Sequence, residues 1–106
     1  MDFEQTMMEL LINAGEARSH AMSAIQHARK REWQQADAAL AASLEASKGA
    51  HKIQTQLIGA DEGCGKVPVT LILVHAQDHL MNAMLCRDLA EEIVLSVSYT
   101  HLRAHE

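Results

Sequence analysis

Residues 2–30 carry the sequence DFEQTMMELLINAGEARSHAMSAIQHARK, which decides the fold class. Its apolar side chains recur at steps of three and four, so they share one face of an α-helix. Asp2, with Gln5 three positions later, is typical of a capping box at a helix start. Gly15 lies inside this helix and indicates that another helix packs closely against that turn. The shared face carries Phe3, Met7, Leu10, Leu11, Ala14, Ala17, Ala21, Ile25 and Ala28.

Two further segments have the same helical spacing, at residues 33–58 and 69–95. Arg31 and Glu32 form a short turn before the first of them. Residues 59–68, GADEGCGKVP, combine glycines with the only proline, so they form a loop, and Pro68 suits the first turn of the third helix. Three long helices with short links predict an all-α fold, an antiparallel up-down-up three-helix bundle formed as one domain by residues 1–95.

The end of the chain departs from this pattern. Residues 96–106, SVSYTHLRAHE, are β-branched and polar where the third helix would be finishing. Chain ends without a packing pattern fray by default. We therefore expect an atypical tail that is not part of the domain fold.

Composition narrows the classes of function. The chain has 106 residues, with nine Lys and Arg against 14 Asp and Glu, and its net charge of −5 argues against binding to nucleic acid. No apolar run approaches the roughly 18 residues that span a bilayer, and the start of the chain has no export signal. Two cysteines, Cys64 and Cys86, do not make a disulfide framework. We expect a cytoplasmic protein that is not inserted in a membrane.

The unusual segment is VHAQDHLM, residues 74–81. His75, Asp78, His79 and Asn82 lie at offsets of 0, 3, 4 and 7, so they share one helical face. Three hypotheses compete: a histidine satisfied within the core, a zinc site on the two histidines, and an imidazole that attacks a phosphoryl group. The motif lacks the glutamate of HExxH, and the cysteines have no nearby pair, which disfavours zinc. Spacing alone does not choose among the three hypotheses.

The segment VHAQDHLMNAML, residues 74–85, occurs together with NAGEARS at residues 13–19 and AHKIQTQLI at residues 50–58. In this order and spacing the three motifs resemble the lactose/cellobiose-type IIA component of the bacterial sugar phosphotransferase system. The resemblance runs from about residue 4 to residue 95. One departure is the turn before the second helix, where the family usually has a glycine and this chain has Arg31 and Glu32.

The resemblance implies a homotrimer that carries a phosphoryl group on His75. The group would come from the histidine-containing phosphocarrier HPr and pass to a cysteine of the IIB component during uptake of a β-linked disaccharide. The resemblance makes His79 and Gln77 neighbours of the site and Asp78 a metal-binding residue at the trimer axis. Three carboxylates meeting there favour a hard cation, so we expect one Mg²⁺ per trimer. Ala76, in place of glycine, favours the cellobiose and chitobiose branch over the lactose branch.

A different class of function remains as the alternative. The stripe of histidines and Asp78 would then only bind a divalent metal and fix the oligomeric state of a non-catalytic helical adaptor. The two hypotheses differ in one observable, because only a relay gains phosphate from its donors.

Overall fold

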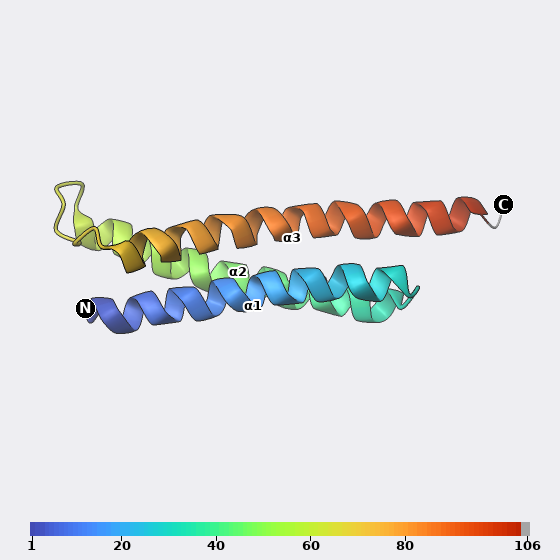
Figure 1. Cartoon of the computed structure of the whole chain (residues 1–106), viewed down its shortest axis with the longest axis horizontal. Coiled ribbons are helices and arrows are strands. Elements are labelled where there is room, and N and C mark those ends of the chain that lie inside the picture. The colour runs from blue at the N-terminus through green and yellow to red at the C-terminus, as the bar shows by residue number, and fades with distance from the viewer. Residues whose placement is uncertain (105–106) are drawn as a thin grey trace.

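The computed structural model describes residues 1–104 and contains three long helices. Helix α1 spans Phe3–Arg29, α2 spans Trp33–Asp61 and α3 spans Leu71–Ala104. Helices α1 and α3 run in the same direction and α2 runs the opposite way, in an elongated bundle of 59 × 20 × 19 Å (Figure 1). The predicted all-α, up-down-up three-helix bundle is confirmed.

At the starts of α1 and α3 a polar side chain accepts a hydrogen bond from the first turn. At α1 the Oδ1 of Asp2 accepts from the backbone nitrogen of Gln5 at 3.2 Å, as predicted. At α3 the Oγ1 of Thr70 accepts from the backbone nitrogen of Leu73 at 3.3 Å. The helix therefore begins at Leu71, and the prediction that Pro68 lies in its first turn is wrong, because Thr70 provides the cap.

The two connections differ in how they reverse the chain. Arg31 turns α1 into α2 with a φ of 63°, in the left-handed region that favours glycine. After α2, which runs to Asp61 and so beyond the predicted residue 58, the Oδ1 of Asp61 accepts from the backbone nitrogen of Val67 at 3.0 Å. Val67 is buried, so this loop is fastened to the end of the bundle.

The buried side chains form two separate clusters along the bundle. We call the larger one the site-end core: Met7, Leu10, Ala14, Ala17, Ala46, Ala50, Ile53, Leu57, Val67, Ala76, Leu80 and Ala83. The smaller, the distal core, consists of Ala24, Ala28, Ala36 and Val94, with Trp33, Ala39 and Leu40 packed against it. In the middle of the bundle the Oγ of Ser43 donates to the backbone oxygen of Ala17 at 2.7 Å. Alanine and serine bring α1 and α2 close together.

Only part of the apolar surface of α3 is buried against α1 and α2. Its buried residues are Ala76, Leu80, Ala83, Ala90 and Val94. Large apolar residues of the same helix lie instead on the exposed side: Leu71, Ile72, Val74, Met81, Leu85, Leu89 and Ile93. An exposed apolar stripe of this length is typical of a surface that another chain covers.

The helix also continues beyond the point where the pattern changes. Residues 96–104 belong to α3, so the expectation of a frayed tail is wrong for them, and residues 105–106 lie outside the described part of the chain. The rings of Trp33 and His101 lie 5.7 Å apart, which places this last segment beside the start of α2. Within residues 1–104, no helix is long and apolar enough to cross a membrane. The domain boundary at residue 95 stays a prediction.

Candidate functional site

Helix α3 places His75 and His79 together, one turn apart. Their ring planes are parallel within 2° and their centroids are 6.1 Å apart. This matches the rise of about 6 Å over four helical residues, so both side chains extend the same way. His75 is exposed and His79 is half-buried. A histidine satisfied within the core is therefore excluded for His75.

Helix α1 forms the wall next to His79. A Cβ built on Gly15 would lie 3.6 Å from Nε2 of His79, which is ordinary van der Waals contact. Helix α3 therefore faces Gly15 through the side chain of His79, but the approach is not the close packing that the glycine led us to expect. The ring of His79 is half-buried and lies against α1 on one side. The ring of His75 is exposed and is therefore accessible to another molecule.

Gln77 lies on the opposite side of α3 from His75. Two residues turn an α-helix by about 200°, which directs Gln77 toward α2. There its Oε1 accepts a hydrogen bond from Nε2 of Gln54. From the sequence alone, Gln54 is named only as part of the segment 50–58. Within one chain, Gln77 thus belongs to the contact between α2 and α3 and is not beside His75.

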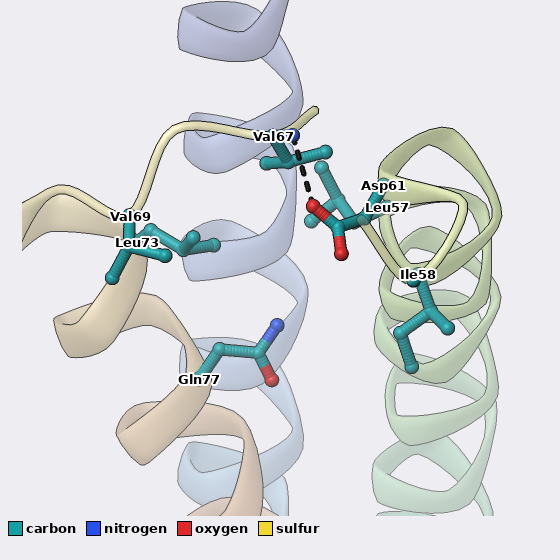
Figure 2. Close-up of a pocket in the computed structure, with 8 residues that line it drawn as sticks. Leu57, Ile58, Asp61, Val67, Val69, Leu73 and Gln77 are labelled. Atoms are coloured by element: carbon teal, nitrogen blue, oxygen red, sulfur yellow. Dashed lines mark hydrogen bonds between the residues drawn. The ribbon is translucent and has the colours of Figure 1, made fainter. Parts of the chain in front are cut away.

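The side chain of Gln77 also lines a cavity of about 250 Å³ between the end of α2 and the start of α3. Figure 2 shows Gln77 extending from α3, and the hydrogen bond between Asp61 and Val67 at the far side of the cavity. The remaining lining is mainly apolar: Leu57, Ile58, Gly63, Val69 and Leu73.

Asp78 lies on the exposed face of α3, between the apolar residues Val74 and Met81. Among residues 1–104 its carboxylate has no hydrogen-bond or ion-pair partner. The same part of the chain contains no group of three or more His, Cys, Asp or Glu side chains placed to hold a metal ion. Within residues 1–104 of one chain, the zinc hypothesis therefore finds no third ligand for His75 and His79.

The arrangement suits one kind of chemistry. An exposed imidazole can approach an electrophile carried by another macromolecule, and histidine has an unprotonated ring nitrogen in much of its population near pH 7. The neighbouring imidazole of His79 can donate a hydrogen bond to a group bound at His75. The two rings lie at the edge between α1 and α3, with His75 exposed to solvent.

Known proteins are similar to this chain in sequence and in fold. Residues 5–98 match the family described as "PTS system, Lactose/Cellobiose specific IIA subunit". The N,N'-diacetylchitobiose-specific EIIA component of Escherichia coli K12 is 45% identical over 93 residues, which cover 88% of this chain and 80% of that protein. The cellobiose-specific EIIA component of Lactococcus lactis is 38% identical over the same shares of both chains.

Solved structures agree with these sequence relatives. The crystal structure of the cellobiose-specific enzyme IIA from Bacillus anthracis has a TM-score of 0.91 and 37% identity, covering 96% of this chain and 94% of that one. The solution structure of the E. coli IIA(chitobiose)–HPr complex gives a TM-score of 0.83 and 40% identity, covering 95% of this chain and 98% of the matched one. With a family match over most of its length, the chain belongs to the lactose/cellobiose-specific IIA subunits of the phosphotransferase system.

Proposed function

We propose that this IIA component accepts a phosphoryl group from HPr on His75 and passes it to a cysteine of a IIB component. The observation that carries the proposal is the exposed ring of His75, stacked one turn from His79 at the edge between α1 and α3. The E. coli IIA(chitobiose) protein, which has a similar fold, forms a complex with HPr, and this supports HPr as the phosphoryl donor.

Each transfer exchanges one bond to phosphorus for another. An unprotonated ring nitrogen of His75 attacks the phosphorus of phosphohistidine in HPr, and the broken N–P bond returns its electron pair to the donor ring. In the second transfer the thiolate of IIB attacks, and the electron pair of the N–P bond returns to His75. An exposed acceptor suits both steps, because two different proteins must reach the same nitrogen.

The sugar is proposed from the relatives, since a phosphoryl carrier need not contact it. The chitobiose-specific and cellobiose-specific relatives are 45% and 38% identical to this chain, whereas the lactose-specific EIIA of Streptococcus mutans is 33% identical. We therefore propose uptake of a cellobiose- or chitobiose-like β-linked disaccharide rather than lactose. A cytoplasmic location stays an expectation from the sequence.

The test of the acceptor is phosphorylation of two variants by enzyme I, HPr and phosphoenolpyruvate, followed by intact mass. His75→Gln should gain no phosphate, whereas His79→Gln should still gain it, more slowly. Full phosphate uptake by His75→Gln would overturn the assignment. An unphosphorylated wild-type protein would favour the alternative, a metal-stabilised adaptor without catalysis.

We also propose that the protein is a homotrimer whose α3 helices meet along the exposed apolar stripe. Leu71, Val74, Leu85 and Leu89 are about half exposed or more, and they follow the three- and four-residue steps of a helix–helix seam. Asp78 interrupts this stripe. In a threefold assembly three copies of its carboxylate converge, which is unfavourable unless a cation or protons neutralise them.

The donor set fits Mg²⁺, since Asp78 offers carboxylate oxygens that are not engaged elsewhere among residues 1–104. Bound by three Asp78 side chains, one such ion would lower the repulsion between the axis and a phosphoryl group on His75. Asp78→Leu should abolish metal binding, measured by elemental analysis, and leave the trimer intact in sedimentation because an apolar residue fills the seam. Asp37→Leu, on the exposed side of α2, is the matched control. A monomeric wild-type protein would contradict the proposal.

A further inference from the structure

Three glycines lie inside helices, and an added Cβ would meet different surroundings at each. At Gly49 it would come within 3.0 Å of Oδ1 of Asn13, so close packing between α1 and α2 accounts for that glycine. At Gly59 it would meet nothing within 4 Å. At Gly15 it would meet Nε2 of His79 at 3.6 Å, which is ordinary van der Waals contact. Helix packing therefore does not require a glycine at position 15.

A methyl group at position 15 would have two opposing effects. Alanine is the better helix former, so α1 would gain stability. The methyl would also lie against Nε2 of His79, where it can neither donate nor accept a hydrogen bond. It would keep water or a phosphate oxygen away from that side of the nitrogen, which costs free energy when the nitrogen needs a polar partner.

The separation of the two rings suits a bridging phosphoryl group. The centroids of His75 and His79 lie 6.1 Å apart. A phosphoryl group extends a few ångströms from the ring that carries it, and a charge-assisted hydrogen bond spans about 2.8 Å more. His79, one helical turn away on the same face, is therefore near enough to donate a hydrogen bond to a group carried by His75.

We infer that Gly15 is a positioning residue of the phosphoryl-transfer site. By lacking a side chain, it leaves Nε2 of His79 open to hydrogen-bond the phosphoryl group on His75. This inference rests on the proposed function and adds to it a residue of α1 that touches neither the phosphoryl group nor the acceptor nitrogen. It acts only through His79.

The experiment compares Gly15→Ala with Gly59→Ala, which makes the same chemical change inside a helix but far from any histidine contact. Both variants should unfold at a higher temperature, by roughly 4 °C or less, because both replace a helical glycine. Only Gly15→Ala should slow phosphorylation by HPr, by about tenfold or more, the scale of one hydrogen bond to a charged group.

A double-mutant cycle separates this role from a general structural effect. In a His79→Ala background, Gly15→Ala should slow phosphorylation no further, since the nitrogen it covers is absent. The ¹⁵N signal of Nε2 of His79 should also move when wild-type protein is phosphorylated, and should move less in Gly15→Ala.

Phosphorylation of Gly15→Ala at the wild-type rate would overturn the inference while leaving the proposed function intact. Equal slowing by Gly15→Ala in the presence and absence of His79 would overturn it as well. If the wild-type protein itself gains no phosphate, the proposed function fails and the inference fails with it.

Discussion

The site-end core and the distal core belong to the same three helices but are filled by different side chains. The site-end core contains the large residues Leu10, Leu57 and Leu80, whereas the distal core is three alanines and Val94. Buried apolar area sets most of the packing free energy, so the two ends contribute unequally to stability. His75 and His79 lie over the better-packed end. In the proposed transfer reaction, the side chains of the site must keep their geometry while two partner proteins bind and dissociate. Close packing beneath the site helps to keep that geometry.

The largest expected effect therefore comes from the site-end core. Leu80→Ala should lower the free energy of unfolding by roughly 2–5 kcal/mol, since Leu80 is fully buried and its loss leaves a cavity. Val94→Ala, in the distal core, should lower it by about 1–2 kcal/mol, because two buried methyl groups are removed among alanines. Urea unfolding at one fixed protein concentration measures both.

Equal losses for the two substitutions would contradict the comparison. In that case the two clusters would act as one continuous core. The position of His75 and His79 over the larger cluster would then not make the site more rigid. Amide hydrogen exchange gives an independent measure, since a weaker distal core should exchange faster than the turns around Leu80.

A smaller effect is expected from the end of α3. Deleting residues 99–106 removes the ring contact between His101 and Trp33, and Tyr99 and Leu102 are largely exposed. The loss in the free energy of unfolding should stay near or below about 1 kcal/mol, the scale of one aromatic pair. Trp33 is the only tryptophan, so its fluorescence reports the distal end directly.

The same deletion should leave phosphorylation of His75 unchanged, because residues 99–104 lie at the other end of the bundle from His75. A loss of several kcal/mol, or of the oligomeric state, would show that residues beyond 98 contribute substantially to stability or assembly. The family match ends at residue 98, which makes this deletion the natural boundary to test.

Helical periodicity was sufficient to predict the three helices and the fold class. It placed Met7, Leu10 and Ala14 on one face, and these residues are buried in the site-end core. It failed at helix ends, where single side chains decide. Thr70, not Pro68, caps α3, because its hydroxyl accepts a hydrogen bond from the first turn. Residues 96–104 are helical although none of them is buried. Helix propensities differ by less than about 1 kcal/mol per residue, so a β-branched and polar sequence does not by itself end a helix.

The candidate site was predicted only in part, for a geometric reason. A step of four residues put His75 and His79 on one face, and the structure stacks their rings. A step of two cannot do this, and Gln77 lies on the α2 side, where it bonds to Gln54. No pattern within one helix reveals such contacts between helices. The roles of Asp78 and Gln77 remain predictions about the assembled protein.

The smallest expected effect concerns the turn between α1 and α2, at the distal end. Arg31 has a φ of 63°, a conformation that costs a residue with a side chain about 1–2 kcal/mol. Glycine relieves this strain but loses about 0.5–1 kcal/mol through its freedom in the unfolded chain. The free energy of unfolding of Arg31→Gly should thus exceed that of Arg31→Ala by about 0.5 kcal/mol. Arg31→Ala keeps the strain and removes the same charge, so it should show no gain.

The difference in the free energy of unfolding between these two variants measures the backbone strain at position 31 separately from the loss of the arginine side chain. The cation at Arg31 lies near the carboxyl end of α1, where it interacts favourably with the helix dipole, and both variants lose that interaction equally. Unfolding in urea, with several repeats to resolve a few tenths of a kcal/mol, gives the comparison. If glycine is no more stable than alanine at position 31, the turn is unstrained. The lower stability of the distal end would then come from the small alanine side chains of the distal core alone. The turn between α1 and α2 would contribute nothing to it.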